Sequence, residues 1–505
     1  MQNIFFRTDS SNQIGNGHVM RCLTLAHELR ERKIKSTFIS RINKNNLNNL
    51  IKSNGFDILE LPIAKNKHDN SDKWLEATEL KDAKETRDLI NNYNNILMII
   101  DHYSIGKTWE NYLRPYLDTI VVIDDLANRT HDCDFIIDQN WFVDMESRYR
   151  DFISYDCVKL FGPRFSILRS EFLRAKEPAI SNIKNVNNIF LFFGGTDQYN
   201  LTSKFIKIFN DPKLQKIRLD VVIGGNNKFK AEIKKLTKLR KNTYLHIQIK
   251  NISRIIKKAD MGIGSAGVNT WERICLGLPS LVVSFAENHE VVLSDLISEE
   301  LIIFLGKFDK LNEFEIKNKL FELIKNPKLL NNQRKKTFEL VDGLGSSRVI
   351  DWITGNIKDS SWKVNIASKK NINLYYEWAN DKEVRNNSLN KNTFSWESHV
   401  CWFRRKLEDE NCQLLIVLID EIPIGQVRFD DEGDYLRINY SIGKQFRGKN
   451  LGKKLLKLAI NKLNNKNNKK LLGEVLPNNI ASSKIFEDLG FSLVKKTNSL
   501  VYIKN

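Results

Sequence analysis

The sequence predicts an α/β protein in which two Rossmann-type units precede a smaller α+β domain. Over the first 350 residues, short β-branched runs alternate with amphipathic helical stretches, and this alternation restarts after the polar stretch 175–188. After about residue 355, a helix-rich segment is followed by consecutive strands. Alternating strands and helices favour a parallel sheet with helices on both faces. We therefore expect domains at 1–175, 185–355 and 362–505.

Each α/β unit contains six strand candidates, and the helices between them have one apolar face. In the first unit the strands are expected at 4–7, 36–40, 57–61, 97–101, 120–124 and 134–138. In the second they are expected at 189–193, 219–223, 244–249, 261–264, 280–284 and 301–304. Two such units in series predict a cleft between them, where ligands of such proteins bind.

Composition limits the classes of function. The 505 residues carry a net charge of +18, but Lys is spread along the chain together with Asn, which indicates solvated faces more than a nucleic-acid surface. Anionic small substrates fit this charge equally well. The six cysteines form no CxxC pair or metal spacing, so we expect free thiols, no metal and a cytoplasmic protein. Arg7 and Asp9 interrupt the first apolar run, and no stretch approaches the ~20 apolar residues of a membrane helix.

The segment RTDSSNQIGNGHVMRC (7–22) is the sharpest local feature of the first unit. A strand ends at Arg7, a loop with Gly15 and Gly17 follows, and a helix opens at His18. Glycines at such a turn let a ligand approach the backbone, and the helix amino end offers free N–H groups. A helix amino end also disfavours imidazolium, so a neutral His18 is a candidate general base for water. A glycine-rich turn with a capping histidine is the structural alternative.

This opening resembles that of the UDP-2,4-diacetamido-2,4,6-trideoxy-β-L-altropyranose hydrolases of pseudaminic acid synthesis. DHY (101–103), VIDD (122–125), GPRFSILRSEF (162–172) and FFGGTD (192–197) agree as well, so the resemblance covers about residues 1–350. It implies a GT-B fold and hydrolysis, with inversion, of the bond between the anomeric carbon and UDP. It also implies that His18 is the base that activates water, in a reaction that requires no metal.

We assign a further set of residues to UDP-sugar binding. Gly194 and Gly195 follow a strand, and GSAGVNTWE (264–272) has small residues that open a helix suited to a diphosphate. Glu272 resembles the acidic residue that grips ribose hydroxyls in GT-B enzymes, although it also fits an ordinary solvated helix position. His102 could position sugar hydroxyls or support the site from behind. The set is Asp9, Gly15, Gly17, Arg21, His102, Gly194, Gly195, Ser265, Asn269 and Glu272.

The segment INYSIGKQFRGKNLGKKLLKLAI (438–460) gives the second strong signal: a strand, a basic glycine-containing loop and a helix start, which together cradle a diphosphate. It resembles motif A (Q/RxxGxG/A) of the GNAT acetyltransferases, with Asn450 in place of the last small residue. VLPNNIASSKIFEDLGF (475–491) resembles the family's NxxSxxxYxxxGF ending, with Phe486 where a tyrosine often acts as general acid. The resemblance implies acetyl-CoA as co-substrate. The residues assigned to it are Ile442, Gln445, Arg447, Gly448, Asn450, Gly452, Asn479 and Ser482.

The acceptor is indicated by EWANDKEVRNNS (377–388) and HVCWF (399–403), which resemble the amino-sugar-acetylating branch of the GNAT family. His399, Glu421 and Tyr440 are candidates to assist loss of the amine proton, and each is as readily structural. The favoured hypothesis is a fusion of two consecutive steps, 4-N-acetylation of a UDP-linked amino sugar and release of UDP. The alternatives are a GT-B glycosyltransferase fused to an acetyltransferase, and a nucleotide-sugar sensor.

Overall fold

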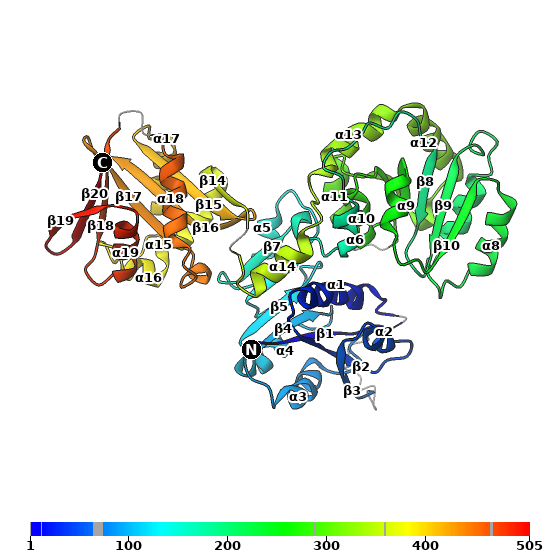
Figure 1. The fold of residues 1–505 in the computed structure, drawn as a ribbon, viewed down its shortest axis with the longest axis horizontal. Coiled ribbons are helices and arrows are strands. Elements are labelled where there is room, and N and C mark those ends of the chain that lie inside the picture. Colours follow the sequence, from blue (N-terminus) through cyan, green and yellow to red (C-terminus); the bar gives the residue numbers. More distant parts are fainter. Residues whose placement is uncertain (1, 12, 64–73, 286–288, 358–359, 465–467) are drawn as a thin grey trace. The chain divides into compact units, whose positions relative to one another are not determined.

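The computed structural model describes residues 2–11, 13–63, 74–285, 289–357, 360–464 and 468–505. The chain divides into two compact units, residues 1–354 and 355–505, which are treated separately below. Unit 1 contains two sheets and unit 2 contains one (Figure 1). All six cysteines are free thiols.

The first lobe of unit 1 is a seven-stranded, wholly parallel sheet of order β3-β2-β1-β4-β5-β6-β7. This order places the topological switch point between β1 and β4. The strands are β1 (Asn3–Thr8), β2 (Ser36–Arg41), β3 (Asp57–Leu61), β4 (Ile96–Asp101), β5 (Thr119–Ile123), β6 (Phe135–Asp138) and β7 (Val158–Phe161). The helices are α1 (Gly17–Glu31), α2 (Asn48–Ser53), α3 (Glu79–Ile90), α4 (Lys107–Leu113), α5 (Met145–Arg148) and α6 (Ser170–Ala175).

The second lobe repeats this plan with six parallel strands of order β10-β9-β8-β11-β12-β13, so its switch point lies between β8 and β11. The strands are β8 (Asn188–Phe192), β9 (Arg218–Ile223), β10 (Thr243–Ile247), β11 (Met261–Ser265), β12 (Ser280–Ser284) and β13 (Ile303–Lys307). The helices are α7 (Leu201–Ile208), α8 (Lys230–Leu239), α9 (Ser253–Lys258), α10 (Val268–Cys275), α11 (His289–Ser298), α12 (Glu313–Lys325) and α13 (Pro327–Phe338).

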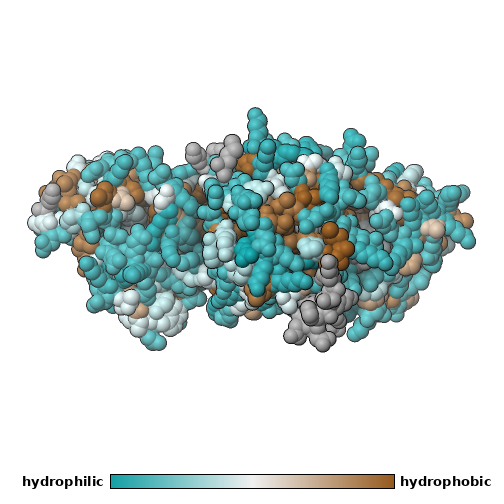
Figure 2. Space-filling view, turned by 90° about the horizontal axis from the view of Figure 1, so that it is seen from below, coloured by the Kyte–Doolittle hydropathy of each residue, from teal (hydrophilic) through white to brown (hydrophobic). Residues whose placement is uncertain are grey.

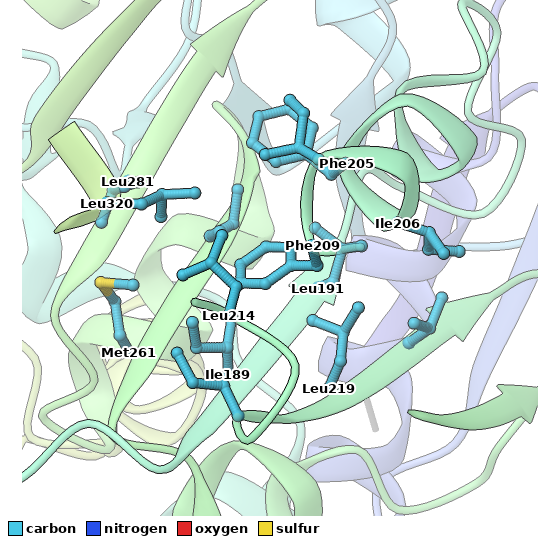
Figure 3. Packing of buried hydrophobic residues seen from close by; sticks show 14 of the residues in the cluster. Ile189, Leu191, Phe205, Ile206, Phe209, Leu214, Leu219, Met261, Leu281 and Leu320 are labelled. Carbon is cyan, nitrogen blue, oxygen red and sulfur yellow. The ribbon is translucent and has the colours of Figure 1, made fainter. Parts of the chain in front are cut away.

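The core of the second lobe explains why these strands read as continuous apolar runs. Phe205 on α7 and Phe209 just beyond it lie against Ile189, Leu191 and Leu219 of the sheet, all buried (Figure 3). Parallel strands covered on both faces are apolar on both sides and do not alternate.

Helix α14 (Gly345–Ile353) ends unit 1 and packs on α1 of the first lobe. Arg32 on α1 donates to Asp351 at 2.7 Å and to the Ser347 hydroxyl at 2.6 Å. Gly345 fits closely here, because a Cβ would lie 2.2 Å from the Ser166 carbonyl oxygen. The chain therefore returns from the second lobe to brace the helix that carries His18.

Unit 2 is built on a seven-stranded mixed sheet of order β14-β15-β16-β17-β18-β20-β19. The strands are β14 (Trp362–Ile366), β15 (Cys412–Ile419), β16 (Ile422–Asp431), β17 (Tyr435–Ile442), β18 (Lys470–Val475), β19 (Ser492–Lys496) and β20 (Leu500–Lys504). The helices are α15 (Ile372–Asn380), α16 (Lys382–Asn386), α17 (Trp396–Glu408), α18 (Gly452–Lys462) and α19 (Ile480–Asp488).

The predicted fold class is confirmed: two parallel Rossmann-type sheets precede an α+β domain. Several strands were missed. β7 is only four residues long, and β14 and β18–β20 lie outside the apolar runs that give a clear strand pattern. The strand expected at 301–304 begins at Ile303. The face in Figure 2 is mainly hydrophilic, with hydrophobic side chains in small groups, and no described helix is long and apolar enough to span a bilayer.

Candidate active sites

The loop between β1 and α1 lies at the switch point of the first lobe, next to the end of β4. Gly15 has φ +83°, a conformation that favours glycine. A Cβ on Gly15 or Gly17 would meet no other atom within 4 Å, so both sit beside open space. Asn16, the residue before α1, makes no side-chain capping bond to the described backbone of the helix. The predicted backbone-approach turn is therefore present, with the first N–H groups of α1 left for a ligand.

His18 forms a buried pair with Asp101, the last residue of β4. Its Nδ1 lies 2.5 Å from Asp101 Oδ1, and the ring is only 4% exposed. A carboxylate can only accept at this distance, so the proton is on Nδ1 and the Nε2 lone pair is left to accept another. The burial of Asp101 tends to raise its pKa, but the charge of Arg21 and the hydrogen bonds from His18 and Arg21 outweigh burial and lower it. The pair has the geometry of an oriented general base.

Arg21, one helical turn after His18, holds this pair in place. It donates to both Asp101 oxygens, from Nε at 2.9 Å and from Nη2 at 2.8 Å, and to Asp125 at 3.2 Å. The ring of Tyr103 meets the His18 ring edge-on at 4.5 Å, and Trp74 lies beside Tyr103 at 5.4 Å.

The sequence identified His18 and Arg21, whereas Tyr103, Trp74 and Asp125 were not assigned to the site. Tyr103 and Asp125 were visible only as parts of the DHY and VIDD motifs. No local pattern marks Trp74, because its place beside Tyr103 is decided by the fold.

Asp9, which was assigned to UDP-sugar binding, is buried under the loop, and His102 has the supporting position that the sequence left open beside sugar contact. Asp9 is fully buried and accepts two hydrogen bonds from Arg7, at 2.7 and 2.9 Å, while His102 Nε2 lies 3.4 Å from the Asp9 carboxylate. Arg7 also donates to the buried Asp82. The two residues therefore support the loop from the protein interior, where the buried charge of Asp9 is paired with that of Arg7.

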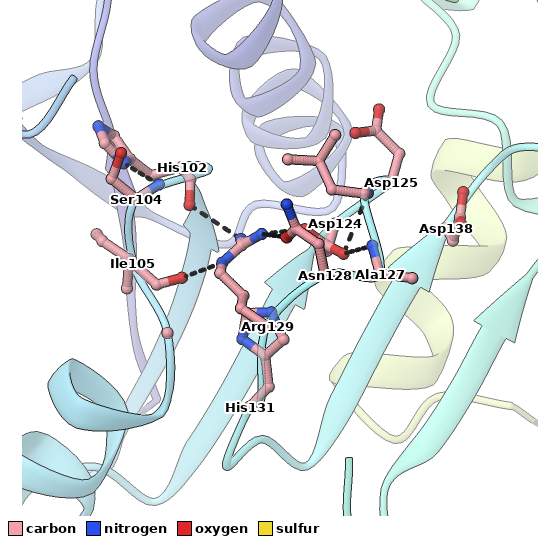
Figure 4. A network of polar contacts seen from close by, with 12 residues as sticks. His102, Ser104, Ile105, Asp124, Asp125, Ala127, Asn128, Arg129, His131 and Asp138 are labelled. Carbon is pink, nitrogen blue, oxygen red and sulfur yellow. Dashed lines mark hydrogen bonds and ion pairs between the residues drawn. The ribbon is translucent and has the colours of Figure 1, made fainter. Parts of the chain in front are cut away.

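A second network fastens the loops that follow β4 and β5 (Figure 4). Arg129 donates to the carbonyl oxygens of Ile105 at 2.8 Å and His102 at 3.3 Å, and to Asp124 at 2.7 Å. Asp138, at the end of β6, lies nearby. Its burial raises its pKa to about 7, a change that the ion pair with Arg148 opposes and the neighbouring carboxylates reinforce.

In the second lobe, the glycine turns that follow β8 and β9 touch each other. Gly194 has φ +87° and open space around it, and the Gly195 carbonyl accepts from Gly224 N at 3.0 Å. A Cβ on Gly224 would lie 2.5 Å from that carbonyl oxygen, so only glycine fits. The expected turn is formed by both loops together, and Gly224 is needed for their close approach.

The start of α10 is tightly organised around Arg273. Gly267 precedes the helix with φ +122° and no side-chain cap. The buried Arg273 guanidinium donates to the Ser265 carbonyl at 3.2 Å and to Asn269 at 2.6 Å, and burial lowers the pKa of Arg273 to about 10. Glu272 accepts from Asn269 at 2.5 Å and from Arg169 at 3.2 Å, and is 9% exposed. The structure thus brings together Ser265, Asn269 and Glu272. The Glu272 carboxylate is fixed by hydrogen bonds and is not exposed to solvent as an ordinary helix position would be.

Unit 2 contains a cavity of about 1060 Å³ at a split in its sheet. β17 and β18 pair in parallel from Tyr435 to Ile438 and then separate, so the β18-facing edge of β17 is unpaired from Asn439 to Ile442. Ile442, Arg447, Gly448, Asn450, Gly452, Asn479 and Ser482 all line this cavity. An unpaired strand edge in a cavity offers backbone groups to an extended amide-containing ligand.

The loop before α18 shows why Asn450 can replace a small residue. Asn450 has φ +56° and Gly448 has φ +72°, and Asn is the residue after glycine that best tolerates this region. Gly452 starts α18 where a Cβ would lie 2.6 Å from Ile485. Arg447 is ion-paired with Asp381 at 2.6 Å and with Glu383 at 2.9 Å, so its side chain ties the loop to α16.

The assigned groups on α19 are tied to neighbouring structure. Asn479 caps α19 by accepting from Ser482 N at 3.2 Å, and the Ser482 hydroxyl accepts from Tyr440 at 2.9 Å. The ring tip of Phe486 lies against Gly473. Gln445 is not among the cavity-lining residues, and its Oε1 is buried without a partner among the described residues.

The three candidates for proton transfer separate in the structure. His399 lines the cavity, and its Nε2–H donates to the Ile372 carbonyl at 3.1 Å, which leaves Nδ1 unprotonated in the neutral ring. Burial lowers the pKa of His399 and raises that of Tyr440, which also lines the cavity. Glu421 lies in the β15–β16 turn beside Lys363 and does not line the cavity.

Comparison with known proteins agrees with this division. Residues 367–492 match the Acetyltransferase (GNAT) domain family. An uncharacterized protein of Methanocaldococcus jannaschii is 26% identical over 97% of this chain and 96% of its own. The UDP-2,4-diacetamido-2,4,6-trideoxy-beta-L-altropyranose hydrolase of Campylobacter jejuni is 25% identical over 57% of this chain and 93% of its own. The crystal structure of Acinetobacter baumannii MurG is 13% identical with a TM-score of 0.49, covering 70% of this chain and 100% of that one.

The chain therefore joins a region related to nucleotide-sugar enzymes to a GNAT acetyltransferase domain.

Proposed function

We propose that unit 1 hydrolyses UDP-2,4-diacetamido-2,4,6-trideoxy-β-L-altropyranose to UDP and the free sugar, a step of pseudaminic acid biosynthesis, and that unit 2 acetylates the 4-amino precursor. The observation that supports the hydrolysis most is the 2.5 Å contact between His18 and Asp101 at the switch point of the first lobe. The similarity to the C. jejuni hydrolase, which spans the same region, supports the choice of substrate.

In the hydrolytic step, His18 Nε2 takes a proton from water while Nδ1–H stays on Asp101. The water oxygen bonds to the anomeric carbon as the bond from that carbon to the UDP oxygen breaks, and UDP leaves with the electron pair. Asp101 stabilises the imidazolium that forms, and Arg21 keeps Asp101 ionised. Free N–H groups at the starts of α1 and α10 would stabilise the charge of the diphosphate.

In the acetyl transfer, the acceptor amine attacks the thioester carbon of acetyl-CoA, which lies along the unpaired edge of β17. His399, with an unprotonated Nδ1, receives the amine proton. The carbon–sulfur bond then breaks, and Tyr440, whose raised pKa keeps it protonated, supplies a proton to the thiolate. Tyr440 thus takes the role left open by Phe486.

The test is incubation of the full chain with the UDP-linked 4-amino sugar, with and without acetyl-CoA, followed by NMR of the products. We expect acetylation only with acetyl-CoA, and UDP release only after acetylation. His18→Ala should stop UDP release and retain acetylation, whereas Glu28→Gln, a change on the same helix away from the pair, should retain both. UDP release by His18→Ala at the wild-type rate would refute the base assignment.

A glycosyltransferase remains the second candidate, because an N-acetylglucosamine transferase of Rickettsia bellii is 30% identical over 29% of this chain. His18 could deprotonate an acceptor hydroxyl as it could water. UDP release that requires an added sugar acceptor would establish this alternative, and release into water alone would exclude it.

A further inference from the structure

The cavity of unit 2 is lined by residues of helices α15–α17 and of helices α18 and α19. Successive side chains of β17 point to opposite faces of the sheet, which shows the face that each lining residue of this strand belongs to. The Tyr440 ring contacts Phe486 of α19, so Tyr440 is on the α18–α19 face. The next residue, Ser441, accepts a hydrogen bond from Gln426 on the other face. Two residues further along β16 on that face, Arg428 lies over Trp402 of α17. The α18–α19 face carries the glycine loop assigned to acetyl-CoA. The α15–α17 face is therefore the side from which the amine arrives.

The arginines in the wall of this cavity differ in their partners. Arg428 is paired with Asp430 at 2.5 Å, Arg437 with Glu474 at 2.6 Å, and Arg447 with Asp381 at 2.6 Å. Among the described residues Arg385 has no carboxylate partner.

Within the described part of the chain, the partners of Arg385 are all neutral groups. Its Nη1 donates to the Asn390 carbonyl at 3.1 Å, its Nη2 donates to the Ser388 hydroxyl at 3.3 Å, and its guanidinium lies 4.9 Å from the centre of the Phe394 ring. Its Nε–H is buried and has no acceptor among the described residues. Burial lowers the pKa of Arg385, since no negative charge opposes that effect. A fixed guanidinium with a free donor, in a cavity wall, is a site for an anion.

We propose that Arg385 binds a phosphate group of the acceptor, so that unit 2 selects a nucleotide-linked amine over a neutral or cationic one. The inference rests on the proposed acetyltransferase function and adds to it the charge class of the substrate. The diphosphate of acetyl-CoA is assigned to the start of α18, and Arg447 of that loop is paired with Asp381 and Glu383, so Arg385 is the wall guanidinium left for a second anion. A polyamine or a free amino sugar brings no anion to this position.

The test uses the full chain and measures initial rates of CoA thiol release. The acceptors are a UDP-linked 4-amino sugar and the same amino sugar without UDP. We expect Arg385→Gln to raise KM for the UDP-linked acceptor about 10- to 100-fold, the effect of losing a charge-assisted contact. The KM for acetyl-CoA and for the UDP-free sugar should change less than about twofold. Arg385→Lys should recover part of the loss, and Arg404→Gln, an exposed control on α17, should behave as wild type.

Other outcomes overturn the inference in distinguishable ways. An equal rise in KM for both acceptors would mean that Arg385 only holds the loop 387–394, and a rise in KM for acetyl-CoA would place it in the cofactor site. If no amino sugar is acetylated, the proposed function fails, and hydrogen exchange still tests the site. Inorganic pyrophosphate should protect peptides covering 381–394 in the CoA-saturated chain, and Arg385→Gln should abolish that protection. Absence of protection in the wild type would refute the anion site.

Discussion

Replacement of Asp138 by Asn should change how the stability of the first lobe depends on pH. Burial raises the pKa of Asp138 from 3.8 to about 7, and its side chain is nearly inaccessible to solvent. Between these two values the folded chain binds more protons than the unfolded chain. The stability contributed by this group is therefore fully present below about pH 4 and is lost as the pH rises through 7. At about 1.36 kcal/mol per pKa unit, the whole loss amounts to roughly 4 kcal/mol.

About 2–3 kcal/mol of this loss falls between pH 5 and pH 8, where it can be measured. Buried groups such as Asp101 and His102 titrate identically in both proteins, so the difference between wild type and variant isolates Asp138. The assay is hydrogen exchange of peptides from β5 and β6 at pH 5, 6, 7 and 8, because it reports the opening of this lobe and not of unit 2. The wild type should lose stability relative to Asp138→Asn as the pH rises. Parallel curves over this range would show that Asp138 is ionised in the folded chain and would refute the reasoning.

Asp101→Asn removes the carboxylate that orients His18 and stabilises its imidazolium, and leaves Arg21 with its contact to Asp125. UDP release should fall by about 100-fold or more, whereas acetyl transfer, measured as CoA thiol release, should be unchanged. Near-normal UDP release would contradict the role of Asp101. Gly224→Ala puts a methyl group 2.5 Å from the Gly195 carbonyl oxygen, so the two turns must move apart. Calorimetry should then show weakened UDP binding. An affinity equal to that of the wild type would mean that the two turns are not part of the UDP site. Asn450 has φ +56°, so an alanine there raises the free energy of this loop conformation by about 1 kcal/mol. Asn450→Ala should therefore raise KM for acetyl-CoA severalfold, whereas Asn450→Gly should match wild type. Equal KM values for the two variants would exclude a conformational role of this residue.

Three glycine turns illustrate how far sequence reasoning reached in the candidate sites. Gly15, Gly194 and Gly448 were identified because a strand, a glycine loop and a helix follow one another along the chain, and each has a positive φ. For Asp9 and His102, the same local pattern does not reveal which side of the loop faces solvent. Asp9 is buried against Arg7, whose other carboxylate partner, Asp82, comes from a distant segment.

The sequence by itself determined the order of elements, the parallel character of the first two sheets and the position of His18 at a helix start, because these follow from periodicity and turn chemistry within a few residues. Only the tertiary structure decided that Asp101, 83 residues away, holds His18 and that Arg385 has no carboxylate partner among the described residues. Partners of this kind are set by strand order and by packing between layers. The charge on one side chain is balanced by whichever segment the fold brings to it, and no local pattern encodes that choice.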